Sequence, residues 1–266
     1  VYIGGGTPTS LSDEQFKRRM EIVSEKFDIS QTDEFTVEAG RPDTITYGKL
    51  KAMAEANVSR ISVNPQTMNQ KTLDLIGRKH SVEDIRKAFY MARENGFGNI
   101  NMDLILGLPE ETLADVENTM KEVEKLSPES VTVHTLAVKR ASRLKENIDA
   151  YDLAAADEME KMIALSAEYA QKMGLSPYYM YRQKAMVGNF ENVGYCKKGM
   201  ESIYNVEIME EKQTIIATGA GGATKLFDSD KNMLTRVFNV KSVEDYTSRF
   251  DEMIERKRKA FSEVKW

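Results

Sequence analysis

Apolar residues follow two different periods along the first 140 residues. Short runs rich in β-branched residues are separated by stretches in which apolar side chains recur at helical spacing. Strand starts lie roughly 25–40 residues apart, which is the length of one strand–helix unit. Repeated units of this kind predict a parallel sheet, either open or closed into a barrel. The expected strands are residues 1–3, 34–38, 60–63, 99–106 and 130–138.

The expected helices begin at capping sequences. Ser12 and Gln15 are spaced as a capping box, with Leu11 and Phe16 as its hydrophobic staple. A second helix begins at Ser81, and Gly96 is placed to end it. The pattern predicts two further helices over residues 112–126 and 150–173.

The pattern changes after residue 175. Residues 177–181 are aromatic, and residues 188–199 have the composition of a loop. We expect two regions, a partial barrel over residues 1–175 and a small α+β region over 176–266, with no low-complexity linker between them. The second region is expected to contain strands at 202–208, 214–218 and 234–239 and a final amphipathic helix at 243–261.

Composition and charge narrow the class of protein. The 266 residues are 41% hydrophobic and 30% charged, which supports a sizeable core and excludes disordered and collagen-like chains. The net charge of −5 argues against nucleic acid as the main partner. No apolar run approaches the ~18 residues that a membrane span needs. The one cysteine, Cys196, allows neither an internal disulfide nor a cysteine-based metal site, and we expect a reducing, cytoplasmic compartment.

A glycine-rich segment follows the first expected strand and precedes the first expected helix. In Gly4-Gly5-Gly6-Thr7-Pro8 the glycines let backbone N–H groups approach a ligand closely, and the Thr7 hydroxyl adds a further hydrogen bond. No Gly-Lys-Ser/Thr follows, so the segment is not a phosphate-binding loop. The contiguous glycines also differ from the dinucleotide-binding fingerprint. A tight turn without a ligand is the alternative.

Two acidic residues interrupt strands that are otherwise apolar. Glu38 ends one strand, and Asp103 lies within another. Burying a carboxylate in a parallel sheet is costly without a partner, whereas near the C-terminal end of a strand it can face a ligand. The alternative for Asp103 is a bond to nearby backbone. His80 and His134 are the only histidines, and two cannot form a metal site by themselves.

A basic and aromatic stretch follows the last helix of the first region. In Tyr181-Arg182-Gln183-Lys184 two cations stand beside aromatic residues. Such a group can hold carboxylates, and arginine can bind them in a bidentate manner. A solvated loop is the alternative.

These segments together resemble one family, the radical S-adenosylmethionine (SAM) enzymes of the oxygen-independent coproporphyrinogen III oxidase type. The resemblance covers residues 1 to about 140, continues in Glu201–Asn205 and Gly219–Ala223, and is strongest to the branch called coproporphyrinogen dehydrogenase. Its motifs are, in order, Gly4-Gly5-Gly6-Thr7-Pro8-Thr9, Val37-Glu38-Ala39, Arg60-Ile61-Ser62-Val63 with Gln66, Ile76-Gly77-Arg78-Lys79-His80, Gly96-Phe97 and Asn101-Met102-Asp103-Leu104-Ile105-Leu106-Gly107-Leu108-Pro109.

The resemblance implies an incomplete parallel (β/α) barrel with a small α+β C-terminal region. It implies SAM and a 4Fe–4S cluster as cofactors. The family holds the cluster through a Cys-x3-Cys-x2-Cys loop upstream of the glycine motif, which this chain lacks, and Cys196 is not in a position to replace it. We therefore expect the first strand–helix unit to be absent, and this piece alone to be inactive.

The resemblance also implies roles for particular residues, although it identifies no catalytic residue. The glycines and Thr7 would hold the methionyl part of SAM. The carboxylates of Glu38 and Asp103 would suit the hydroxyl groups of its ribose, and the guanidinium of Arg78 would suit its carboxylate. The implied cofactor-binding residues are Gly4, Gly5, Gly6, Thr7, Glu38, Gln66, Arg78, Asp103, His134 and Ala137. Arg182 and Lys184 are the expected substrate-binding residues.

The implied reaction is the oxidative decarboxylation of coproporphyrinogen III to protoporphyrinogen IX in haem synthesis, by a 5′-deoxyadenosyl radical. Its partners would be the tetrapyrrole substrate and an electron donor, with neither nucleic acid nor membrane involved. Two alternatives keep the same fold. One is a haem-binding chaperone, and the other is a radical methyltransferase that acts on haem.

Overall fold

The computed structural model describes residues 1–137, 154–182 and 190–264, and the chain forms two compact units. The first unit is Val1–Glu201 and the second is Ser202–Trp266. Each unit is described by itself.

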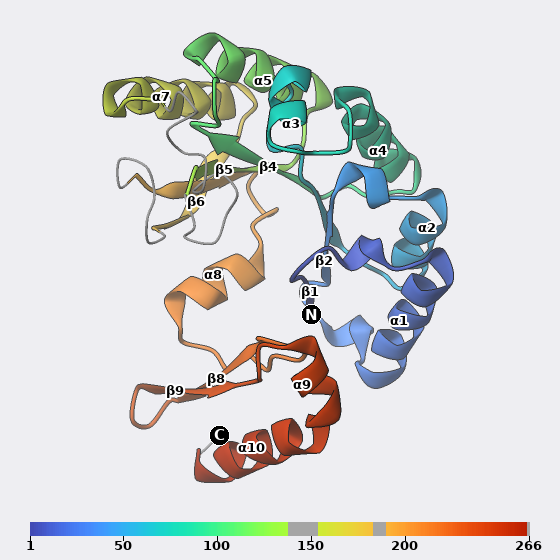
Figure 1. Cartoon of the computed structure of the whole chain (residues 1–266). Helices are drawn as coiled ribbons and strands as arrows, with labels where there is room; N and C mark the ends of the chain where they lie inside the picture. The colour runs from blue at the N-terminus through green and yellow to red at the C-terminus, as the bar shows by residue number, and fades with distance from the viewer. Residues whose placement is uncertain (138–153, 183–189, 265–266) are drawn as a thin grey trace. The chain divides into compact units, whose positions relative to one another are not determined.

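The first unit is built on one curved seven-stranded sheet (Figure 1). Five strands lie side by side in chain order and are parallel, β7 pairs with β5 in antiparallel orientation, and β6 pairs with β7 in antiparallel orientation at the edge of the sheet. The order is β1 (Tyr2–Ile3), β2 (Thr36–Gly40), β3 (Arg60–Val63), β4 (Ile100–Leu106), β5 (Ser130–Thr135), β7 (Asn192–Cys196) and β6 (Ser176–Tyr181). This is the incomplete parallel barrel that the sequence predicts.

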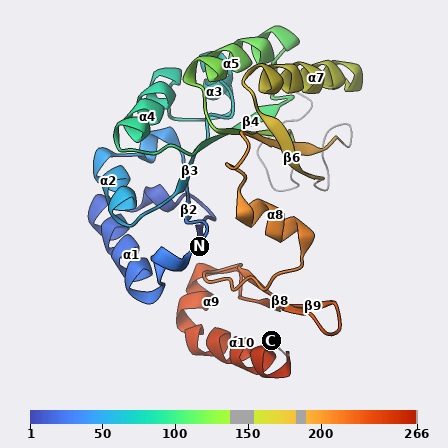
Figure 2. The same ribbon diagram turned by 180° about the vertical axis from the view of Figure 1, so that it is seen from behind.

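Helices cover the outer face of this sheet, and the same arrangement is seen from behind in Figure 2. They are α1 (Asp13–Lys26), α2 (Tyr47–Glu55), α3 (Gln70–Leu75), α4 (Val82–Glu94), α5 (Leu113–Leu126) and α7 (Ala156–Lys172). The strand residues that face them, among them Val37, Ile61 and Met102, are fully buried in one hydrophobic core. Removing this apolar surface from water is the main force that holds the helices on the sheet.

The helix starts are confirmed where the sequence carries capping signals. Ser12 accepts a hydrogen bond from the Gln15 backbone, and the Gln15 side chain accepts one in return from the Ser12 backbone. Ser81 and Asp84 form the same reciprocal pair at the start of α4. Each box satisfies two backbone N–H groups that the helix itself leaves unpaired.

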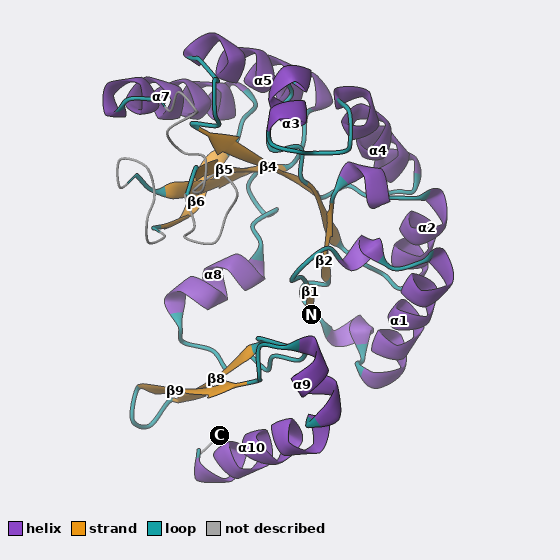
Figure 3. Cartoon of the chain, viewed as in Figure 1, coloured by secondary structure: helices purple, strands orange, loops and turns teal. Residues whose placement is uncertain are grey.

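The inner face of the sheet is polar, because side chains alternate between the two faces of a strand. Val37 and Ala39 face the helices, so Thr36 and Glu38 face inward. The same alternation places polar residues of the other parallel strands on the inner face. These residues are Tyr2, Arg60, Ser62, Asn101, Asp103, Ser130, Thr132 and His134. The strands are drawn in orange in Figure 3.

The second unit is a hairpin of two antiparallel strands accompanied by three helices (Figure 3). Its elements are α8 (Ile203–Glu210), β8 (Ala223–Asp228), β9 (Met233–Phe238), α9 (Val243–Ser248) and α10 (Phe250–Glu263). None of the described helices in either unit has the length and apolar character that crossing a membrane requires.

Three expectations about the later elements are wrong. Residues 202–208 were expected as a strand but begin helix α8, whose start Ser202 caps by accepting from the Asn205 backbone. A short apolar run fits the two-residue period of a strand and the 3.6-residue period of a helix equally well. The Ser202 cap therefore indicates which of the two forms. The stretch 214–218 contributes only a single bridge, between Ile215 and Lys225. The helix expected over 243–261 is two helices, which meet at Arg249.

The loop expected over residues 188–199 contains strand β7, and this moves the boundary between the units. We expected the first region to end at residue 175, but β6 and β7 extend its sheet, so the first unit reaches Glu201. Gly194 lies in the middle of β7. In the structure it makes room for an aromatic ring, because a Cβ atom at Gly194 would lie 1.9 Å from Cε1 of Tyr179.

We predict that Gly194→Ala destabilises the first unit by about 1–3 kcal/mol, because the added methyl group overlaps a packed ring. Denaturant unfolding measures the change. Gly98→Ala is the matched control, because no atom lies within 4 Å of its Cβ position. We expect it to be neutral or slightly stabilising, through the lower entropy of the unfolded chain. Equal effects of the two substitutions would contradict the packing argument.

Candidate functional site

The glycine segment lies directly against Glu38 at the inner face of the sheet. The Tyr2 hydroxyl donates to Oε1 of Glu38, and the Gly5 backbone N–H donates to the same carboxylate. Gly4 has no room for a side chain, since a Cβ atom there would lie 2.5 Å from the Tyr2 ring and 3.0 Å from Cδ of Glu38. Gly4 therefore packs closely against Tyr2 and Glu38.

The next two glycines are open. Gly5 and Gly6 have φ angles of 76° and 57°, which favour glycine, and no atom lies within 4 Å of either Cβ position. The segment is fixed beyond them, where the Thr9 hydroxyl donates to the Ala39 carbonyl at 2.5 Å. Backbone N–H groups beside open space at the end of a parallel strand form a cradle for a polar ligand.

Asp103 is held by side chains rather than by nearby backbone. Its Oδ1 accepts a hydrogen bond from the Asn101 amide at 2.7 Å, and Nε2 of His134 lies 3.9 Å from the same oxygen. Asn101 is in turn fixed by the Thr132 hydroxyl, which donates to its Oδ1 at 3.1 Å. The backbone-bonded alternative considered for Asp103 is thus not what the structure shows.

The two carboxyl groups differ in their pKa values. Burial raises the pKa of Glu38, and the negative charge of Asp103 raises it further. Tyr2 and Gly5 act to lower this pKa, but their effect is smaller. Burial also acts to raise the pKa of Asp103, but the His134 ring and the Asn101 amide outweigh it, so this pKa lies below its usual range. Neighbouring carboxyl groups with pKa values pushed apart are typical of functional sites.

Gln66 lies beside Asp103 through its backbone. Its N–H donates to the Asp103 carbonyl at 3.0 Å, and its carbonyl accepts from the Ile105 N–H at 2.9 Å. Gln66 is buried and has a φ angle of 71°, which is uncommon for a residue with a side chain. The structure therefore brings the backbone of Gln66 next to that of Asp103.

The remaining predicted residues lie in different surroundings. Arg78 is close enough to Arg41 and Asp43 for their charges to act on it, while burial lowers its pKa. Ala137 is half-buried and follows β5. Arg182 forms an ion pair with Glu191 at 2.9 Å, and Lys184 lies outside the described residues.

Polar atoms deeper on the inner face have no hydrogen-bond partner among the described residues. They are Oγ1 of Thr36, Nε of Arg60 and Oγ of Ser62, all in residues that are almost completely buried. Arg60 makes one hydrogen bond, to the Ser130 hydroxyl at 3.2 Å. Buried polar atoms are normally satisfied, so this face is suited to water or a polar ligand.

Sequence reasoning did not identify several residues of this network, namely Tyr2, Asn101, Thr132 and Tyr179. Asn101 lies two residues before Asp103, and Tyr2 lies one residue before the buried Ile3. The two-residue period of a strand would have placed Tyr2, Asn101 and Thr132 on the inner face. No such signal exists for Tyr179, which comes from an antiparallel strand after the change of pattern.

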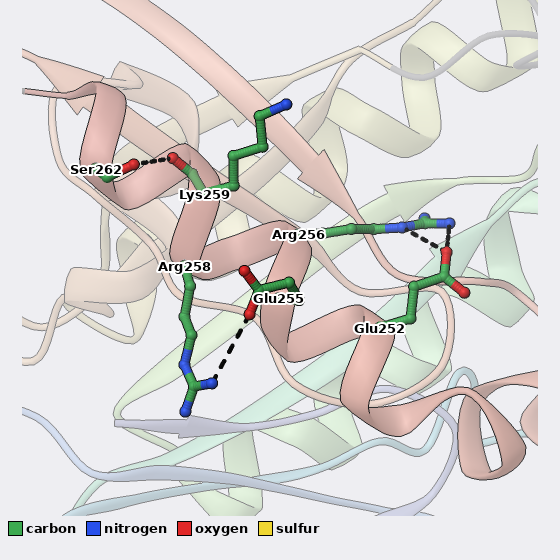
Figure 4. Close-up of a pocket in the computed structure, with 6 residues that line it drawn as sticks. All are labelled: Glu252, Glu255, Arg256, Arg258, Lys259 and Ser262. Carbon is green, nitrogen blue, oxygen red and sulfur yellow. Dashed lines mark hydrogen bonds and ion pairs between the residues drawn. The ribbon is translucent and has the colours of Figure 1, made fainter.

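A charged surface pocket in the second unit contains none of these residues (Figure 4). It is lined by Glu252, Glu255, Arg256, Arg258, Lys259 and Ser262, all from α10. Its side chains pair with one another, for example Arg256 with Glu252 at 2.5 Å. Such exposed pairs along one helix are usual on a protein surface.

The described residues contain no group of three or more His, Cys, Asp or Glu side chains arranged to hold a metal ion. The single cysteine, Cys196, is buried, and burial raises the pKa of its thiol to about 12. A thiol with so high a pKa is a poor metal ligand, because the thiolate is the binding form.

Comparison with known proteins identifies the class. Residues 1–123 match the model of the Radical SAM superfamily. Over 265 residues the chain is 44% identical to the oxygen-independent coproporphyrinogen-III oxidase-like protein HemZ of Bacillus subtilis, an alignment that covers 99% of this chain and 53% of HemZ. Over 223 residues it is 34% identical to the heme chaperone HemW of the same organism, covering 83% of this chain and 55% of HemW.

A solved structure gives the same fold. The radical SAM enzyme coproporphyrinogen III oxidase (HemN) from Escherichia coli superposes with a TM-score of 0.73, at 22% identity, over 94% of this chain and 56% of that one. Residues 1–123 are thus a radical SAM domain, and the members of that superfamily use SAM and a 4Fe–4S cluster. Within it the chain resembles the coproporphyrinogen III oxidase-like proteins, and it spans about half the length of the curated relatives it matches.

We predict a pH-dependent difference in stability between the protein and its Glu38→Gln variant. The folded state raises the carboxyl pKa above the ordinary 4.5, so it disfavours the ionised form. The stability of the unaltered protein relative to the variant should therefore be greatest below pH 4.5 and fall as the pH rises through the folded pKa. Urea unfolding from about pH 4 to pH 8 measures this. A difference that grows with pH would contradict it.

Proposed function

We propose that this chain binds SAM on the inner face of its sheet and forms the cofactor-binding part of an oxygen-independent coproporphyrinogen III oxidase. The observation that carries the proposal is the open glycine segment at the carboxyl end of β1, which lies against Glu38, together with Asp103 on the same inner face, whose charge acts on that carboxyl group. Ligands of α/β proteins bind at this end of the strands.

The chemistry of these groups fits SAM. The open backbone at Gly5 and Gly6 suits the methionyl carboxylate and ammonium, with Thr7 beside it. Carboxylates are acceptors for ribose hydroxyl groups, which fits Glu38 and Asp103. Arg78, Gln66, His134 and Ala137 complete the proposed set, with Arg78 as a partner for the cofactor's carboxylate.

The residues of this chain do not provide a 4Fe–4S site, because it contains one cysteine, with a pKa raised by burial. Bound SAM, on reduction by one electron from the cluster, would supply the radical chemistry that removes a hydrogen atom from the substrate. The residues described here would orient the cofactor and exclude water from it.

We propose the tetrapyrrole coproporphyrinogen III as the substrate. Each reacting propionate arm would lose a hydrogen atom, carbon dioxide and one electron to become a vinyl group. The names of HemZ and the E. coli enzyme support this assignment. The region from residue 176 onward would contact the substrate, and Arg182 and Lys184 would hold its carboxylates.

A haem chaperone is the second candidate, and the similarity to HemW over 223 residues favours it. Anaerobic incubation of a longer protein that includes the cluster-binding loop, reconstituted with iron and sulfide, with coproporphyrinogen III, SAM and a reductant separates the two. We expect protoporphyrinogen IX, detected by the mass lost as carbon dioxide. Stoichiometric haem binding without this product would favour the chaperone.

We predict that Asp103→Asn weakens SAM binding by about 10- to 100-fold, the loss expected for a hydrogen bond to a charged group. Equilibrium dialysis with labelled SAM measures the affinity. The control is Asp33→Asn, which neutralises an exposed carboxylate outside the site. If both variants bind SAM as the unaltered protein does, Asp103 is not a cofactor contact.

A further inference from the structure

Two chains of interacting side chains connect Asp103 to strand β6. In the first, Tyr179 and Thr132 both pair with Gly194, from opposite sides, and the Thr132 side chain acts on the Tyr179 hydroxyl. Thr132 donates to Asn101 at 3.1 Å, and Asn101 donates to Asp103 at 2.7 Å. The first step passes over Gly194 of the intervening strand β7, the second crosses from β5 to β4, and the third follows one face of β4. The carboxylate is thus coupled to a residue 76 positions later in the sequence.

The second chain passes through His134. The Tyr181 hydroxyl lies 3.2 Å from Nδ1 of His134, and Nε2 of the same ring lies 3.9 Å from Oδ1 of Asp103. The second distance is in the range of an ion pair and is too long for a direct hydrogen bond. The ring is hydrogen-bonded to the phenol at Nδ1, and its Nε2 faces the carboxylate.

The two chains begin at neighbouring rings. Tyr179 and Tyr181 lie two residues apart on β6 and are stacked, with ring centroids 5.9 Å apart and planes inclined by 5°. Gly194 on β7 leaves the space that the Tyr179 ring occupies. The stack therefore sets the positions of both hydroxyl groups together.

We infer that Tyr179 and Tyr181 are positioning residues that orient the Asp103 carboxylate, Tyr179 through Thr132 and Asn101, and Tyr181 through His134. The inference rests on the proposed function, in which Asp103 contacts the cofactor. A carboxylate held from two directions has its orientation set before the ligand arrives, which lowers the cost of binding.

Phenylalanine is the substitution that tests this, because it keeps the stacked ring and removes only the hydroxyl. We expect Tyr179→Phe and Tyr181→Phe each to weaken SAM binding by about 2- to 10-fold, the range for one net hydrogen bond. Tyr195→Phe is the matched control. Its hydroxyl belongs to a buried tyrosine of β7 that has no link to Asp103.

A double-mutant cycle separates positioning from general stability. Tyr181→Phe should weaken SAM binding in the unaltered protein but add nothing in the Asp103→Asn background, because its effect acts through that carboxylate. Additive losses would overturn the inference. The same cycle applies to Tyr179→Phe.

Carboxyl NMR of ¹³C-labelled aspartate gives a readout that does not involve the cofactor, with Asp103→Asn assigning the signal. The charged and titratable groups that act on Asp103 are Tyr2, Glu38, Arg60, His134 and Tyr179. Removing either phenol loosens a group that stabilises the carboxylate, so the Asp103 titration should move to higher pH in both variants and stay in place in Tyr195→Phe.

The outcomes distinguish the inference from the proposed function. If Asp103 titrates at the same pH in all three tyrosine variants, the positioning inference is wrong, whatever SAM binding shows. If its titration shifts but Asp103→Asn binds SAM as tightly as the unaltered protein, the positioning stands and the proposed cofactor role of Asp103 fails.

Discussion

A parallel sheet that helices cover on one face only must fill its other face with side chains that tolerate water or bond to one another. In the first unit the outward residues of each strand enter the hydrophobic core, and alternation sends polar residues inward. Glu38, Arg60, Asp103 and His134 therefore share one surface without any local sequence motif that joins them. The candidate site is a consequence of this one-sided burial.

The electrostatics of that surface follow from how each carboxylate is paired. Glu38 has a neutral hydroxyl and one backbone donor, so burial dominates and its pKa rises. Asp103 faces an amide, an imidazole and the charge of Arg60, and its pKa falls. Neighbouring carboxylates would repel each other if both were ionised, and their different partners reduce this cost. One sheet face thus offers both an ionised acceptor and a carboxyl group that protonates more readily.

The strands β6 and β7 add tyrosine hydroxyl groups to this surface. They extend a parallel sheet in the antiparallel sense and bring a tyrosine pair to the edge of β5. Their hydroxyl groups reach two residues of β5, Thr132 and His134. Through these contacts the edge strand β6 is coupled to Asp103 in the middle of the sheet.

The sequence by itself determined the order of strand–helix units, the helix starts at Ser12 and Ser81, and the glycine segment between the first strand and the first helix. These depend on neighbours three or four residues apart, or on a repeat of two or 3.6 residues, so they are visible locally. Only the tertiary structure decided that residues 203–210 form a helix, that 192–196 form a strand, and that Tyr179 and Tyr181 act toward Asp103. Tyr181 and His134 are 47 residues apart in the chain. Their contact depends on strand pairing and on the space left by Gly194, and neither is encoded by the residues that surround them in sequence.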